Sequence, residues 1–290
     1  MLSTKVCSFA ARSVPTTNSC LVADSGAATL FGSTTMSVLF RRWALLVFAP
    51  LLLLLHPASG VSSLPRAGCD PKYATFNQEQ RLLSVIETGV PKNVRHYLGW
   101  VTSDDILDAL RQPRYLQWAE LFCGTGTLSM HLGKLMPRGR SIDMAVGGEA
   151  HNICSVAGYA HCIRTVLHLV AFAFCWMAPP CSLWVFLSTG IHKRSWLNAP
   201  GDTSRSDIRQ SHLIVSRVCL LARIMSCRLV QWVVEQPVTS LMFRYRTFMS
   251  LRLCQISFFG LKLKRKFLWL GHWGGPMTKN RSYFLCGEHS

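Results

Sequence analysis

Acidic residues are scarce in this chain of 290 residues, which has 14 Asp and Glu against 31 Lys and Arg and a formal net charge of +17. The imbalance is concentrated in residues 151–290, which hold seventeen basic and four acidic side chains. A surface of this kind favours a polyanionic partner, and we expect nucleic acid. The alternative is a solvated basic surface that binds no polyanion.

The sequence also lacks any Cys-x-x-Cys pair, although it contains 12 cysteines. This absence argues against a zinc ribbon, and we expect no metal. Several cysteines stand among apolar residues, where a free thiol behaves as a small hydrophobic side chain. The long apolar segments of the C-terminal half indicate a core that does not depend on disulfides.

The apolar run at residues 43–55 is short for a membrane span, because thirteen helical residues cover about 20 Å and the hydrocarbon core is roughly 30 Å thick. Arg41 and Arg42 precede the run, and Pro57-Ala58-Ser59-Gly60 follows it, which is typical of a secretory signal. We therefore expect residues 1–65 to be a disordered leader with a signal peptide. The alternative is a single membrane anchor. The predicted destination is the secretory route or a plastid-type organelle.

A glycine turn follows the predicted strand at residues 117–122. The turn is Cys123-Gly124-Thr125-Gly126, and a helix is expected directly after it. Its glycines permit positive φ and leave the backbone open to a ligand at the helix N-terminus. The dinucleotide fingerprint is excluded, because Ser129 occupies the position of its third glycine.

An acid stands where nucleotide-binding α/β folds need one. Asp143 lies nineteen residues beyond Gly124, after a short predicted strand at residues 140–143. In such folds an acid near this offset accepts hydrogen bonds from ribose hydroxyls. The alternative for Asp143 is a turn or N-cap residue.

Two later segments combine an apolar strand with a polar end. Residues 171–177 are continuously apolar and run into Ala178-Pro179-Pro180-Cys181, where two prolines must take the chain out of a sheet. Residues 229–234 form a second apolar strand, which leads into Glu235. Because ligands bind beyond the carboxyl ends of strands in open α/β sheets, both ends are candidate site positions.

In this order, the segments resemble the motifs of S-adenosylmethionine (SAM) methyltransferases, and most closely those of DNA cytosine-5 methyltransferases. The stretch from Glu120 to Gly126, Glu-Leu-Phe-Cys-Gly-Thr-Gly, is similar to their first motif. Cys181 after a proline resembles their Pro-Cys motif, and Glu235-Gln236-Pro237 stands where they have Glu-Asn-Val. Residues 259–267 resemble their last block, of which Arg265 is retained while Leu263 replaces the glutamine.

The resemblance implies a Rossmann-like α/β fold and SAM as the cofactor. The thiolate of Cys181 would add to C6 of cytosine, Glu235 would hold the N3 proton or the exocyclic amine, and Arg265 would supply positive charge. The residues that would bind SAM are Glu120, Phe122, Gly124, Thr125, Gly126, Asp143 and Pro179. The alternatives are a turn cysteine without chemistry at Cys181 and a strand-end acid paired with arginine at Glu235.

We expect a helical lead-in over residues 66–115 and a methyltransferase-like domain over 116–290. A helix with an apolar stripe is predicted over 206–227, and further strands are predicted near 252–258 and 266–270. The family's target-recognition domain normally follows the last block, and we expect no counterpart of it in the nineteen residues 272–290. Two alternatives therefore stand beside base methylation: a SAM methyltransferase with another acceptor, and a catalytically degenerate domain that binds nucleic acid or protein.

Overall fold

The computed structural model describes residues 71–251, 264–269 and 280–285, with side chains over 77–251. The apolar run at residues 43–55 and the strand expected at 252–258 lie outside these ranges. Within them, no helix combines the length and the hydropathy that crossing a membrane requires.

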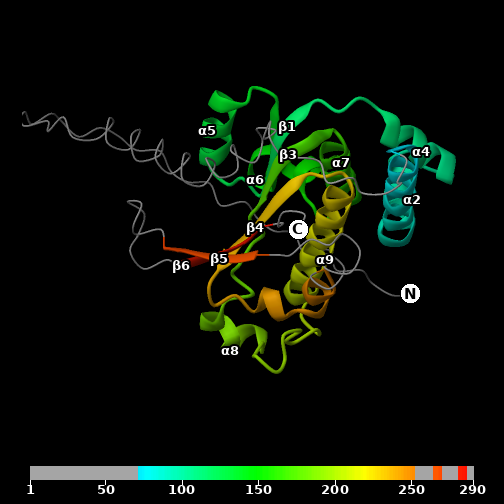
Figure 1. Cartoon of the computed structure of the whole chain (residues 1–290). Coiled ribbons are helices and arrows are strands. Elements are labelled where there is room, and N and C mark those ends of the chain that lie inside the picture. Colours follow the sequence, from blue (N-terminus) through cyan, green and yellow to red (C-terminus); the bar gives the residue numbers. More distant parts are fainter. Residues whose placement is uncertain (1–70, 252–263, 270–279, 286–290) are drawn as a thin grey trace, which may run out of the picture.

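A six-stranded sheet in the order β2-β1-β3-β4-β6-β5 forms the centre of the described residues (Figure 1). Four strands run parallel, and β6 is antiparallel to both of its neighbours. The strands are β1 Leu116–Leu121, β2 Gly139–Ile142, β3 Leu169–Met177, β4 Gln231–Pro237, β5 Lys264–Trp269 and β6 Asn280–Leu285. The predicted α/β class is confirmed, and four parallel strands linked through helices are consistent with a Rossmann-like fold.

Helices join each pair of consecutive parallel strands. The α-helices are α2 Pro71–Gly89, α3 Lys92–Tyr97, α4 Ser103–Arg111, α5 Thr127–Leu135, α6 Met144–Gly147, α7 Val156–Leu167, α8 Thr189–His192 and α9 Ser206–Cys227. Three short 3₁₀ helices are η1 Gly148–His151, η2 Phe186–Ser188 and η3 Leu241–Arg244. The bounds of α9 coincide with the helix predicted from its apolar stripe.

The two faces of the sheet bury different clusters, because successive side chains of a strand point to opposite faces. Ala119 and Leu121 of β1 belong to the larger cluster, to which α7, α9 and α2 also contribute. Trp118, on the other face, packs with Leu132 of α5 and Trp176 of β3. Figure 1 shows α5 on one side of the sheet and α7 and α9 on the other.

Strand β4 is displaced from its predicted position. It covers Gln231–Pro237 instead of residues 229–234, so Glu235 lies within the strand instead of after it. Leu229 has φ +59, which is outside the extended conformation, so the strand begins after it. Pro237 closes it, as expected of a residue with no N–H to donate.

A buried arginine joins three segments behind the sheet. Arg228 is 3% exposed, and its Nη2 donates to the carbonyl of Leu167, the last residue of α7, at 2.9 Å. Its Nη1 donates to the carbonyl of Leu110 at 3.5 Å. Burial lowers the pKa of Arg228 to about 10. The guanidinium thus satisfies carbonyls at the ends of α4 and α7, which have no partner within their own helices.

Replacing Arg228 with methionine should lower the free energy of unfolding by about 2 kcal/mol, because buried carbonyls lose their donor. The matched control is Arg111→Met, whose side chain is 63% exposed and pairs only with exposed Asp108. That change should cost less than about 0.5 kcal/mol. Urea denaturation measures both variants, and equal losses would refute the structural role of Arg228.

Candidate functional site

Left-handed backbone marks the turn after β1. Phe122, Gly124 and Gly126 have φ values of +64, +54 and +69. No atom lies within 4 Å of a Cβ built at either glycine, so the glycines serve the backbone conformation and not tight packing. Phe122 has a side chain that disfavours positive φ, so its backbone conformation is strained. This residue lies at the mouth of the cavity described below.

The side chain of Asp143 connects the turn to the end of β2. Its Oδ2 accepts from Gly124 N at 2.8 Å, and its Oδ1 accepts from Ala145 N at 2.8 Å as the N-cap of α6. The N-cap role considered from the sequence is therefore present. Each carboxylate oxygen has a further lone pair, which leaves acceptor capacity for a ligand.

Glu120 is a buried residue of β1, just before the turn. It is 5% exposed and accepts from Ser129 Oγ of α5. Burial raises the pKa of Glu120, and the nearby charges of Glu235 and Asp143 raise it further. The group therefore favours its protonated form more than an exposed glutamate does.

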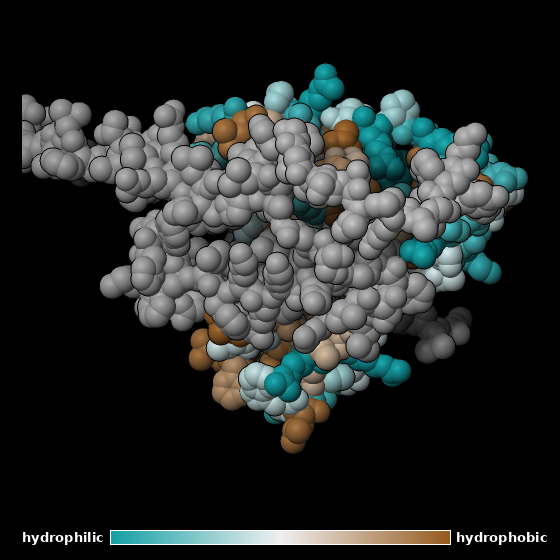
Figure 2. Space-filling view, in the orientation of Figure 1, coloured by the Kyte–Doolittle hydropathy of each residue, from teal (hydrophilic) through white to brown (hydrophobic). Residues whose placement is uncertain are grey.

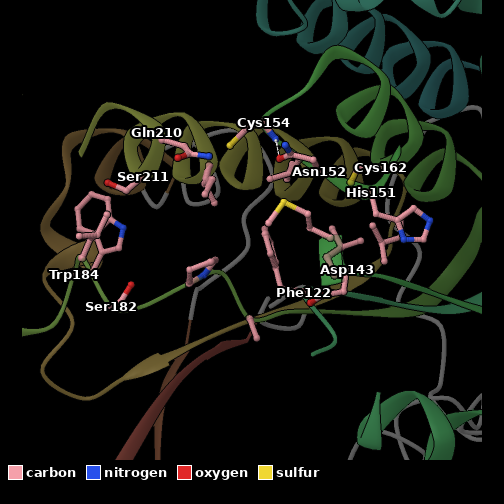
Figure 3. A pocket seen from close by; sticks show the side chains of 18 of the residues that line it. Phe122, Asp143, His151, Asn152, Cys154, Cys162, Ser182, Trp184, Gln210 and Ser211 are labelled. Carbon is pink, nitrogen blue, oxygen red and sulfur yellow. Dashed lines mark hydrogen bonds between the residues drawn. The ribbon is translucent and has the colours of Figure 1, made fainter. Parts of the chain in front are cut away.

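A cavity of about 410 Å³ opens at the carboxyl ends of β1, β2 and β3. Phe122 and Asp143 border it from the sheet, and Gln210 and Ser211 border it from the first turns of α9 (Figure 3). Trp184 lies at the α9 end of the cavity in the same view. Open α/β sheets bind ligands at this edge, where the order of strands reverses.

The wall formed by residues 151–155 is fixed from behind by Arg217. Its Nη1 donates to Ser155 O at 2.9 Å and also to Ile153 O. Asn152 and Cys154 of this wall line the cavity, and Asn152 Oδ1 accepts from Cys154 N at 2.9 Å. Burial raises the pKa of the Cys154 thiol, so it is mainly uncharged near neutral pH.

The structure brings only part of the predicted cofactor set to the cavity. Phe122 and Asp143 line it. Five other predicted cofactor residues are not among those that line it, and they are Glu120, Gly124, Thr125, Gly126 and Pro179. The turn glycines act through the backbone, whereas Glu120 is held on the α5 face of the sheet.

Of the predicted catalytic residues, neither Cys181 nor Glu235 lines the cavity. Pro180 and Ser182 border it, but Cys181 between them does not. Glu235 accepts from Trp176 Nε1 at 3.1 Å on the face of the sheet that holds α5. Arg265 falls in β5, whose side chains are outside the described set.

Sequence reasoning missed the brace that holds the Pro-Pro turn. Gln236 is 1% exposed, and its Nε2 donates to Pro179 O at 2.6 Å. Ser240 Oγ donates to Gln236 Oε1 at 2.9 Å. The brace fixes the exit of β3 against β4, and so positions the turn that carries Cys181.

The polar residues that α9 presents to the cavity were also missed. They are Asp207, Gln210 and Ser211, at the start of a helix whose apolar stripe identified only its buried side. Asp207 is paired with Arg205, whose Nη2 lies 2.7 Å from Asp207 Oδ2. Gln210 and Ser211 are three and four residues beyond Asp207, and this spacing was the available signal that the three residues share one helix face.

No family model and no curated protein matches this sequence. Among solved structures, one similar chain is described as an antibiotic related methyltransferase, at 9% identity and a TM-score of 0.28. The alignment covers 65% of this chain and 95% of that one. We take no functional assignment from a likeness of this size. The described residues form an α/β domain, consistent with a Rossmann-like fold, with a cavity at its strand ends.

Replacing Glu120 with glutamine should stabilise the protein at neutral pH. The raised pKa of Glu120 means that its ionised form is disfavoured in the folded state, so stability is lost as pH rises through the interval between the unfolded and folded values. The gain should shrink as pH falls towards about 4, where glutamate is protonated in both states.

Thermal unfolding at several pH values checks this expectation, with Glu149→Gln as the control because Glu149 is exposed. A gain that does not depend on pH, or one that the control shares, would contradict it.

Proposed function

We propose that this chain is a SAM-dependent methyltransferase. The observation that carries the proposal is the contact of Asp143 with Gly124 N, which joins the glycine turn and the acid into one side of the cavity. In α/β folds that bind nucleotides, the turn admits the ligand to the backbone and the acid accepts from ribose hydroxyls. The cavity volume of about 410 Å³ suits a small-molecule ligand such as SAM.

The sheet gives independent support. The reversed strand β6 lies between β4 and β5 at one side of four parallel strands. The four parallel strands, linked through helices, are consistent with the Rossmann-like fold that the proposal requires. A SAM molecule bound here would supply an electrophilic methyl group, while Phe122, Asp143 and Asn152 would hold and orient it.

The acceptor that we favour is a nucleic-acid base, with C5 of cytosine first. The thiolate of Cys181 would add to C6, C5 would take the methyl group, and loss of the C5 proton to a base would allow the thiolate to leave. Glu235 would hold the N3 proton or the amine. The base would need to leave its helix stack, and the basic balance of residues 151–290 suits such a partner.

A second candidate is a domain that binds SAM but does not use Cys181 for chemistry. The supporting observation is that neither Cys181 nor Glu235 lines the cavity. Glu235 also accepts from Trp176 Nε1. A SAM methyltransferase with another acceptor fits this arrangement, as does a degenerate domain that only binds nucleic acid or protein.

Calorimetry with the full chain should show saturable SAM binding that weakens roughly ten-fold in Asp143→Asn, because the amide removes one acceptor of a charged contact. Asp104→Asn is the control, since Asp104 is exposed on α4 away from the cavity. No binding by a folded wild-type protein would overturn the methyltransferase proposal and favour the degenerate domain.

A 5-fluorocytosine oligonucleotide separates the acceptors, because fluorine at C5 prevents release of the thiolate after methyl transfer. Incubation with SAM should give a denaturation-resistant adduct in wild type and in Cys123→Ser, but none in Cys181→Ser. Cys123 and Cys181 are both half-buried free thiols, so the pair is matched. SAM binding without an adduct in wild type would favour another acceptor.

A further inference from the structure

A group of large apolar side chains projects from the segment between the Pro-Pro turn and α9. We define residues 183–199, which include η2 and α8, as the α8 loop. Leu187 and Leu197 are 96% and 101% exposed, and Phe186, Ile191 and Trp196 are each more than half exposed. Figure 2 shows hydrophobic colour at the end of the molecule where Figure 1 places α8. Exposed apolar groups gathered in this way mark an interaction surface.

The α8 loop is rigidly built beneath these side chains. Trp184, His192 and Arg194 are at most 1% exposed. Arg194 donates to Ala199 O at 3.0 Å and to Ser211 Oγ at 2.7 Å, and its guanidinium lies 3.4 Å from the centre of the Trp184 ring. The apolar groups are therefore presented by a buried framework, and their exposure is a property of the folded loop.

Cations accompany the apolar group on the loop and on the segments beside it. Arg244 lies 3.8 Å above the Trp196 ring, from the segment on which the loop packs. The exposed cations on the loop and on the segments packed against it are Lys193, Arg205, Arg209, Arg244 and Arg246. Two half-buried acids, Asp202 and Asp207, face the same region, and Asp207 is already paired with Arg205. The surroundings therefore carry an excess of positive charge.

We propose that the α8 loop docks on an anionic lipid surface. Its leucine and isoleucine side chains would enter the boundary between headgroups and acyl chains, while Lys193 and the arginines would meet lipid phosphates. Trp196 suits the interfacial layer, where an indole ring is half apolar and half polar. None of the five exposed apolar residues lines the cavity, so the proposal goes beyond the methyltransferase function and does not depend on it.

Single-stranded nucleic acid is a less suitable partner for this surface. Its bases stack on free aromatic faces, and one face of Trp196 is covered by Arg244. The two most exposed side chains, Leu187 and Leu197, offer no ring on which a base could stack. Exposed aliphatic side chains with cations on the same and neighbouring segments match an anionic bilayer better than they match a polynucleotide.

The test compares the full chain with Leu187→Gln/Leu197→Gln on vesicles of about three parts phosphatidylcholine to one part phosphatidylglycerol. The double variant should partition roughly ten-fold more weakly, because two leucine side chains are lost from the lipid. Val101→Gln/Leu135→Gln should bind as wild type does, since these residues are 78% and 61% exposed on other elements. All three proteins retain residues 43–55, so any contribution of that run is the same in each.

Tryptophan quenching by brominated lipid gives a second readout. Wild type should lose more fluorescence on anionic vesicles than Trp196→Phe does. Equal partitioning of wild type and Leu187→Gln/Leu197→Gln, or equal quenching with and without Trp196, would overturn the proposal. Oligonucleotide binding and self-association are measured without vesicles on the same proteins. Loss of either in Leu187→Gln/Leu197→Gln alone would also overturn the proposal, because the surface would then bind nucleic acid or a second copy of the chain.

Discussion

The hydrogen bonds of the Asp143 carboxylate hold the candidate site together. One oxygen accepts from the glycine turn after β1, and the other begins α6 after β2. Two neighbouring parallel strands thus end in a single connected structure, and the cavity opens beside it. The turn has two glycines in left-handed conformations, and this contact from outside the turn limits the freedom that glycine gives its backbone.

The buried cations provide the second layer of support. Arg217 fixes the loop that forms one wall of the cavity. Arg194 fixes the α8 loop at the other end of the cavity. Both lie within apolar surroundings and donate mainly to carbonyls, not to carboxylates. Composition alone would assign these arginines to the surface, but they are buried and stabilise the fold. Fewer basic side chains are therefore available to bind a polyanion.

Sequence reasoning found the elements with strong local signals. The stripe of α9 predicted its bounds, and the strands predicted before Gly124 and before Asp143 are both present. It missed contacts that depend on tertiary structure. Gln236 and Pro179 are fifty-seven residues apart, and a neutral amide in a strand carries no local sign that it will brace a distant turn. Glu235 was predicted to follow the strand, but β4 continues to Pro237 because its last residues pair with β6, which lies more than forty residues further along the chain.

Trp184 lies between two surfaces with different uses. It borders the cavity, and the guanidinium of Arg194 covers its ring within the α8 loop. Any ligand whose affinity depends on the position of this indole must also change the free energy of the loop conformation. The loop conformation then changes the free energy of ligand binding by the same amount. A ligand in the cavity that displaced Trp184 would thus be coupled thermodynamically to docking of the α8 loop, and the sign of that coupling could be measured on this single side chain.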